Sequence, residues 1–334
     1  MKYLLPVLLL NICFITFSAG ETFKDRKGTS PKKNSPSYTD STFGLQKKIN
    51  AFWEKTRADL SLIQIDAKVE PLKDMLPYRA YSVTVCSLDS VMVTGFLAIP
   101  VQGEAPAKPW PVIINTVGYS GRGDKAALNE CMRGYAILQV YPRGQGESEK
   151  YFKLKGDKVS TNLNRPEDAY YRGGYADIIR MIDYVTTRSD IDSSRIAMVS
   201  ASQGGGIALA VAALDTRIKA VVAHVPFLCN FRLAATIPKS LVKVLLDREK
   251  ANNEAALQTL DYFDPLHLAP MIRVPVLMSA GGKDELCPMK TIRSVYKRIH
   301  SRKKKLKIYP DLPHTTCMDF YNITWPWLGK HFRK

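Results

Sequence analysis

Residues 195–214 read RIAMVSASQGGGIALAVAAL, and this stretch decides how the rest of the chain is interpreted. RIAMVS has the composition of a buried strand, and GIALAVAAL has that of a helix built from small and apolar residues. Ser202 lies at the junction, beside a run of glycines. Taken alone, this pattern fits a structural glycine-rich turn nearly as well as a strained turn that exposes a nucleophile.

The segments on either side alternate between strand and helix patterns. YRGGYADIIRMIDYVTTR (171–188) has the apolar spacing of an amphipathic helix. Short apolar runs predict further strands at 111–117, 134–141, 218–225, 274–280 and 305–310. Continuous apolar strands that alternate with helices indicate an α/β fold, with a mostly parallel central sheet and helices on both faces.

Three further elements are predicted outside this alternation. Helical spacing of apolar residues at 45–63 predicts an N-terminal helix, and two β-rich runs around SLDS (87–90) predict a β-hairpin within 78–100. MDFYNITWPWLGKHF (318–332) predicts a closing helix that Pro326 interrupts.

A catalytic interpretation of Ser202 requires an acid and a histidine in a fixed order. In an α/β-hydrolase the chain presents the nucleophile serine first, then Asp or Glu, then His, each after a strand. His314 follows the strand predicted at 305–310 and is the candidate base. The other histidines considered, His224, His267 and His331, lie at a strand end, on a loop or short helix, and in the last residues of the chain.

Asp284 is the candidate acid because it follows the strand predicted at 274–280. Asp264 is its competitor, but it precedes that strand. With this assignment, His314 takes the proton of Ser202, and Asp284 orients the imidazole and stabilises its charged form. The backbone N–H groups of Gln203 and Tyr119 are the candidate oxyanion donors.

Three short motifs carry a resemblance to a known family. They stand here as Arg143-Gly144-Gln145, SASQGG (200–205) and His314-Thr315. The sequence resembles the acetyl xylan esterase and cephalosporin C deacetylase family, the seventh carbohydrate esterase family, from about residue 45 to the end. That family is marked by R-G-Q, G-x-S-Q-G-G and H-E, so Ser200 and Thr315 depart from its pattern.

The resemblance implies a serine esterase of the α/β-hydrolase fold that removes acetyl groups from sugars, xylo-oligosaccharides or cephalosporin-type acetyl esters among its substrates. It implies no metal and no organic cofactor, and it implies that Arg143 and Gln145 brace the site. It also implies a homo-oligomer, a hexamer whose sites open into an inner chamber, with the hairpin used for subunit contacts. An exposed hairpin edge would need such a cover.

Two alternatives stay open at this point. One is a hydrolase of the same fold with another substrate, such as a peptidase or a general carboxylesterase. The other is a non-catalytic binding protein that uses a basic surface. The order of Ser202, Asp284 and His314 argues against the second alternative.

The N-terminus has a different composition from the rest of the chain. Residues 1–20 show one lysine, an apolar stretch and then Ser18-Ala19-Gly20, which is the layout of a signal peptide. Polar and basic residues at 21–44 predict a flexible linker, which leaves 45–334 as the hydrolase domain. We therefore expect an exported protein, periplasmic or secreted, without a membrane anchor after cleavage.

Charge and cysteine content narrow the function further. The net charge of +17 concentrates at 24–33 and 297–307, but no nucleic-acid-binding motif accompanies it, so no nucleic-acid partner is expected. No C-x-x-C spacing occurs, which excludes a zinc ribbon. Five cysteines follow the predicted signal peptide, and their pairing stays open: Cys86, Cys131, Cys229, Cys287 and Cys317.

Overall fold

A computed structural model describes residues 40–72, 78–101, 109–121 and 128–332. The predicted signal peptide at 1–20, and residues 21–39 of the predicted linker, lie outside the described residues. Residues 40–44, also predicted as linker, are the first residues of a helix instead. None of the helices in the described ranges combines the length and the apolar character that crossing a membrane would take.

The core of the domain is one nine-stranded sheet with the order β1-β2-β3-β5-β4-β6-β7-β8-β9. The strands are β1 (Lys68–Pro71), β2 (Tyr78–Cys86), β3 (Met92–Pro100), β4 (Trp110–Thr116), β5 (Ala136–Tyr141), β6 (Ile191–Ala201), β7 (Ile218–His224), β8 (Val276–Gly281) and β9 (Lys304–Tyr309). From β5 to β9 every pairing is parallel, whereas β1, β2 and β3 add antiparallel pairings at one end. The predicted α/β-hydrolase fold with a mostly parallel sheet is confirmed.

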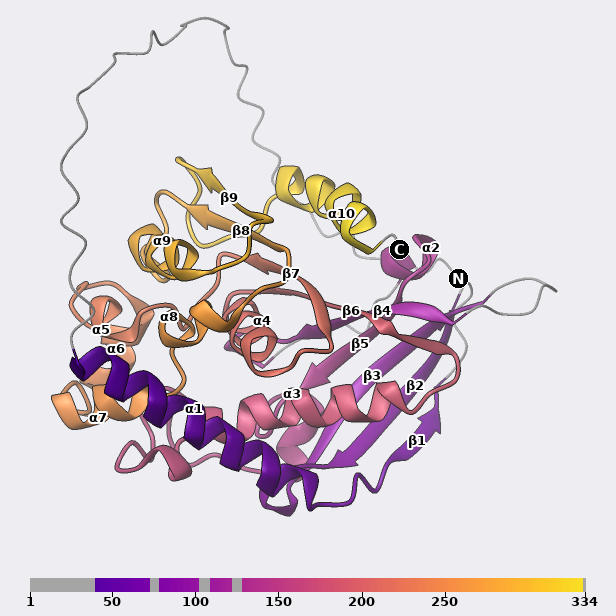
Figure 1. Ribbon diagram of the computed structural model, residues 1–334, viewed down its shortest axis with the longest axis horizontal. Coiled ribbons are helices and arrows are strands. Elements are labelled where there is room, and N and C mark those ends of the chain that lie inside the picture. Colours follow the sequence, from indigo (N-terminus) through magenta and orange to yellow (C-terminus); the bar gives the residue numbers. More distant parts are fainter. Residues whose placement is uncertain (1–39, 73–77, 102–108, 122–127, 333–334) are drawn as a thin grey trace, which may run out of the picture. The chain divides into compact units, whose positions relative to one another are not determined.

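Helices connect the strands and cover the sheet. They are α1 (Asp40–Ser61), α2 (Leu128–Met132), α3 (Tyr170–Thr186), α4 (Gln203–Leu214), α5 (Phe231–Ala234), α6 (Leu241–Arg248), α7 (Glu254–Leu260), α8 (Pro265–Leu268), α9 (Met289–Arg298) and α10 (Met318–Phe332). Short 3₁₀ turns are η1 (Leu88–Ser90), η2 (Gly146–Lys150), η3 (Pro166–Asp168) and η4 (Ala269–Met271). Helices α1, α3, α4 and α9 lie on one side of the sheet, and α2 and α10 lie on the other (Figure 1).

The alternation of side chains along β7 explains why its sequence is a continuous apolar run. Val221 and Ala223 belong to the large core cluster that α3 and α4 cover. Ala220 and Val222 point the other way, into a cluster with Phe320 of α10. Successive residues of a strand face opposite sides of the sheet, so a strand covered on both faces is apolar at every position.

Helix α1 is fixed to the domain by side chains that reach distant backbone carbonyls. Trp53 is buried and its indole N–H donates to the carbonyl of Tyr262 at 2.8 Å. Arg57 donates to the carbonyl of Leu214 at 2.7 Å, and Arg180 of α3 donates to the carbonyl of Leu60.

Two sequence expectations need correction. The predicted hairpin exists as β2 and β3, but β2 pairs with β1 and β3 pairs with β5, so the hairpin belongs to the central sheet and neither strand is a free edge. At this end of the sheet the edge strand among the described residues is β1, whose four residues are all exposed. Helix α10 also runs through Pro326 without interruption, with Phe320 and Leu328 seated on the sheet on either side of the proline.

Candidate active site

Ser202 occupies a sharp turn between β6 and α4. Its φ of 53° and ψ of −123° lie outside the regions that L-residues ordinarily adopt. Backbone hydrogen bonds hold this conformation on both sides of the residue. Ser202 N–H donates to the carbonyl of His224 at 2.9 Å, and the Ser202 carbonyl accepts from the N–H of Phe227 at 2.9 Å. The strained turn is thus fixed by its neighbours, as at many functional sites.

The glycines after Ser202 are needed because backbone passes close to them. A Cβ on Gly204 would lie 2.3 Å from the carbonyl oxygen of Thr116, and one on Gly206 would lie 2.2 Å from that of Phe227. Ser200, which stands where the family pattern has glycine, fits without displacing the turn. Its Oγ accepts a hydrogen bond from the N–H of Thr116 at 3.1 Å.

The structure brings Ser202, His314 and Asp284 together. His314 follows β9, and its Nε2 lies 2.9 Å from Ser202 Oγ. Asp284 follows β8, and its Oδ2 lies 2.7 Å from His314 Nδ1. With the proton on Nδ1, His314 donates to Asp284 and accepts from the Ser202 hydroxyl. The other carboxylate oxygen of Asp284 accepts from the N–H of Cys287 at 2.8 Å, which fixes the carboxylate plane.

The competing acid and the competing histidines lie elsewhere. Asp264 is buried, caps α8, and accepts from the N–H groups of Leu266, Asn230 and Phe231. His267 pairs with Asp261 at 3.4 Å, and His331 is in α10. His224 ends β7, where burial lowers its pKa to about 4, and its Nδ1 lies 3.3 Å from Ser279 Oγ.

The two candidate oxyanion donors are placed differently in the backbone. Gln203 is the first residue of α4, where a helical N–H has no acceptor within the helix. Tyr119 lies in the turn after β4, and its ring packs edge-on against Phe227 at 5.5 Å. Across the described ranges, neither N–H donates to a protein group, so both are free to bind a developing oxyanion.

Side-chain amides under this turn hold it in place. Gln145 Nε2 donates to the carbonyl of Gly118 at 3.0 Å and to that of Tyr119 at 3.3 Å. Gln203 Nε2 donates to Gln145 Oε1 at 2.8 Å, and the hydroxyl of Tyr170 donates to the same oxygen at 3.1 Å. The buried Gln145 therefore ties the turn at Tyr119 to the residue that follows Ser202.

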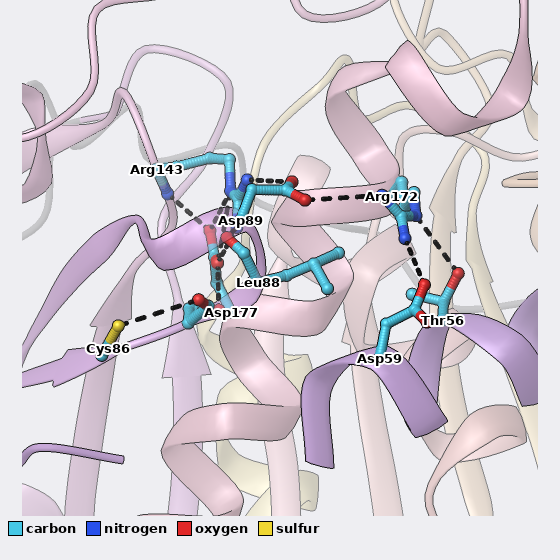
Figure 2. A network of polar contacts seen from close by, with 9 residues as sticks. Thr56, Asp59, Cys86, Leu88, Asp89, Arg143, Arg172 and Asp177 are labelled. Atoms are coloured by element: carbon cyan, nitrogen blue, oxygen red, sulfur yellow. Dashed lines mark hydrogen bonds and ion pairs between the residues drawn. The ribbon is translucent and has the colours of Figure 1, made fainter. Parts of the chain in front are cut away.

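Arg143 is anchored by an acid that the sequence analysis did not single out. Asp177 of α3 is fully buried and accepts from Arg143 N at 2.8 Å, from Nη2 at 2.8 Å and from Nε at 3.0 Å. Figure 2 shows the guanidinium between Asp177 and Asp89, while Arg172 joins Asp89 to Asp59 of α1. Burial opposes the charge of Arg143, but the neighbouring Asp177 outweighs it and raises the pKa overall.

A glycine makes room for this ion pair. A Cβ on Gly173 would lie 2.3 Å from the Arg143 guanidinium carbon. Sequence reasoning could have found Asp177 from its position, because it lies within the apolar run of α3 beside Ile178. A carboxylate in that position requires a buried partner.

One group of side chains combines donors that metals prefer. Ligand atoms of Asp284, Cys287 and His314 lie within 4.8 Å of one another. Burial raises the pKa of the Cys287 thiol, and the Asp284 and His314 side chains already hydrogen-bond to each other. The arrangement is thus organised for proton transfer from Ser202 through His314.

One family of known proteins matches most of this chain. The family described as acetyl xylan esterase (AXE1) matches residues 39–331. Acetyl esterase Axe7A of Xylanibacter ruminicola is 29% identical over 188 residues, which are 54% of this chain and 41% of the relative. The chain spans less than half the length of the curated relatives it matches.

Two solved structures are similar along most of the chain. An acetyl xylan esterase from Paenibacillus sp. R4 is 28% identical, with a TM-score of 0.77 over 86% of this chain and 99% of that one. Acetyl xylan esterase 1 from Thermoanaerobacterium sp. JW/SL YS485 shares the fold, with 21% identity and a TM-score of 0.76 over 87% of this chain and 98% of that one.

Proposed function

The chain belongs to the acetyl xylan esterase family, and on that premise we propose that it is a serine esterase that removes acetyl groups from acetylated sugars. The observation that carries the proposal is the hydrogen-bonded series from Ser202 Oγ through His314 to Asp284, at a strained turn between strand and helix. Short acetylated xylo-oligosaccharides are the proposed substrates.

The first half of the reaction forms an acetyl-enzyme. Ser202 Oγ attacks the acetyl carbonyl carbon while its proton passes to His314 Nε2. The carbonyl oxygen becomes negative and is stabilised by the N–H groups of Gln203 and Tyr119. When the tetrahedral intermediate collapses, the bond to the sugar oxygen breaks, and the sugar hydroxyl leaves with the proton from His314.

The second half releases acetate by the same groups. Water loses a proton to His314 and attacks the acetyl carbon, and the Ser202 ester bond breaks with return of that proton to Oγ. The carboxylate of Asp284 accepts from His314 Nδ1–H and keeps the imidazole in the tautomer that accepts from Ser202. Every step uses side chains and backbone N–H groups of this chain.

The runner-up function is that of a hydrolase with the same chemistry and another substrate, such as a peptidase or a general carboxylesterase. Rates on p-nitrophenyl acetate and acetylated xylo-oligosaccharides, compared with a peptide p-nitroanilide, separate the two. Ser202→Ala should lower ester turnover by several orders of magnitude, because triad members act as a unit. Near-normal hydrolysis by this variant would show that Ser202 is not the nucleophile.

We also propose export and self-association. Export is supported by the signal-like layout of residues 1–20, and it predicts a mature chain that begins near Glu21. Self-association is supported by the exposed strand β1, which among the described residues pairs with β2 on one side only, so that a neighbouring copy could pair with its other side. Mass spectrometry of the secreted protein tests the first proposal, and light scattering combined with rates on oligomeric and polymeric xylan tests the second.

A further inference from the structure

One lysine lies next to the candidate oxyanion turn. Lys158 Nζ is 4.2 Å from the centroid of the Tyr119 ring. That ring packs against Phe227, whose N–H donates to the Ser202 carbonyl. The contacts therefore run in series from Lys158 through the rings of Tyr119 and Phe227 to the backbone of the Ser202 turn.

The charge of Lys158 is not neutralised by a contact. In the ranges that the structure describes, Lys158 Nζ has no hydrogen bond and no carboxylate within 4.0 Å, and its direct partner is the Tyr119 ring. Asp157 and Glu149 exert a longer-range attraction, but Asp157 is also shared with Arg248 at 3.8 Å. Lys158 is half-buried, and desolvation lowers its pKa, so a further anion beside it would be favourable.

Polar atoms near Lys158 in the sequence and around the same ring also lack partners. Ser160 is buried, and its Oγ has no hydrogen-bond partner among the described residues; the same holds for Asp157 Oδ1 and the hydroxyl of Tyr119. Buried polar atoms in folded proteins are normally paired with protein, water or ligand.

We propose that Lys158 selects acetyl esters of sugars that carry a carboxylate, such as acetylated oligosaccharides with a uronic acid unit. This inference rests on the proposed esterase function and adds a substrate class to it. Lys158 attracts the carboxylate of the bound sugar while the acetyl group lies at Ser202. The cation acts on binding and positioning, so it is a specificity-determining residue and takes no part in bond breaking.

The experiment compares two acetylated xylo-oligosaccharides of equal length, one neutral and one with a uronic acid unit, at low salt. The measured quantity is the ratio of kcat/KM for the acidic substrate to kcat/KM for the neutral one. Lys158→Gln should lower this ratio about fivefold, as expected when one charge is lost roughly 8 Å from a carboxylate at an effective dielectric constant near 40. Lys158→Arg should retain the ratio.

The matched control is Lys155→Gln. Lys155 belongs to the same segment and carries the same charge, but it is exposed, so its removal should leave the ratio unchanged. Salt supplies a second measurement that needs no variant. About 1 M NaCl should bring the wild-type ratio towards that of Lys158→Gln, because screening shortens the range of the attraction.

The outcomes separate the two levels of the proposal. If neither acetyl ester is cleaved in a Ser202-dependent way, the proposed function is wrong. If both are cleaved but the ratio is equal in the wild type, Lys158→Gln and Lys155→Gln and does not respond to salt, the function stands and the role of Lys158 is refuted.

Discussion

Asp177→Asn removes one charge from the most buried ion pair near the active site, and it should destabilise the protein strongly. Asp177 has no exposed surface, and only 5% of the Arg143 side chain is exposed. The substitution keeps the size of the side chain, so its effect reports the charge and the hydrogen bonds. Arg143 would be left as a buried cation with a weaker set of acceptors.

The contacts of Asp177 determine how much unfolding free energy the substitution should remove. Asp177 accepts from three nitrogens of Arg143 and from Ser87 Oγ at 2.7 Å, and an asparagine oxygen can accept only part of this set. Removing one partner of a buried pair typically costs about 3–5 kcal/mol. Arg143 keeps the Leu88 carbonyl at 2.9 Å and Asp89 at 3.4 Å, so we expect a loss near the lower end, about 3 kcal/mol.

A second ion pair provides the control. Arg165 and Asp168 also approach to 2.8 Å, but 68% and 43% of their side chains are exposed. Asp168→Asn should leave the unfolding midpoint in guanidinium chloride unchanged, because water and salt screen an exposed pair. The double variant Arg143→Met/Asp177→Leu should recover part of the stability lost in Asp177→Asn, because no unpaired charge remains. The recovery is partial because the Arg143 N–H and the Ser87 hydroxyl lose their acceptor.

The assay is guanidinium denaturation with kcat measured on the same preparations. Asp177→Asn should lower kcat as well as stability, because Arg143 begins the segment that carries Gln145 to the turn at Tyr119. Burial is the property that distinguishes the two ion pairs. Equal shifts of the unfolding midpoint in Asp177→Asn and Asp168→Asn would therefore show that burial does not set the cost of removing the charge.

Three further predictions concern the elbow, the acid and a buried histidine. Asp284→Asn should abolish most esterase activity, because it favours the wrong tautomer of His314. Asp264→Asn should lower stability with a smaller effect on kcat. A large loss of kcat in Asp264→Asn with little loss in Asp284→Asn would assign the acid to Asp264. Gly204→Ala should reduce the yield of soluble folded protein far more than Gly205→Ala. The closest contact of the added Cβ is 2.3 Å at Gly204 and 3.2 Å at Gly205. Similar yields of the two variants would show that these close contacts do not limit folding. The pKa of His224 is about 4 in the folded protein, against the ordinary histidine value of 6.5. As the pH falls, the unfolded chain therefore binds its proton first, and the folded state loses stability between pH 6.5 and pH 4. The loss of unfolding free energy from this residue is at most about 3.5 kcal/mol. Unfolding midpoints of His224→Gln should vary less over this range than those of the wild type, and equal slopes would exclude the histidine as the cause.

The parts of the site that follow a strand could be predicted from the sequence. Ser202, Asp284 and His314 each follow a segment with a strand pattern, and parallel strands bring their carboxyl ends to one edge of the sheet. Their order along the chain, serine then aspartate then histidine, is the order found in α/β-hydrolases. These signals are local, so the pattern within single segments is sufficient to find them.

The parts that depend on pairing between distant segments could not be predicted in the same way. Strand β3 pairs with β5 and not with its neighbour in sequence, β4, so the place of the hairpin in the sheet is a property of the whole fold. The acid that anchors Arg143 lies 34 residues away in α3. The segment between β7 and β8 forms short helices without long periodicity, although Asn230, Ser240, Asn253 and Asp264 cap them.

The attachment of α1 has a consequence for the order in which the chain folds. Its hydrogen-bond partners come 157 residues later at Leu214 and 209 residues later at Tyr262, and Arg180, which bonds to Leu60, comes 120 residues later. A helix with such distant partners cannot dock when it is made, because the surface that receives it does not yet exist. During synthesis α1 is the first described element to leave the ribosome and one of the last to reach its final place. The aromatic side chain of Trp53 stays exposed for that interval, which makes α1 the segment that most needs protection from aggregation in the nascent chain.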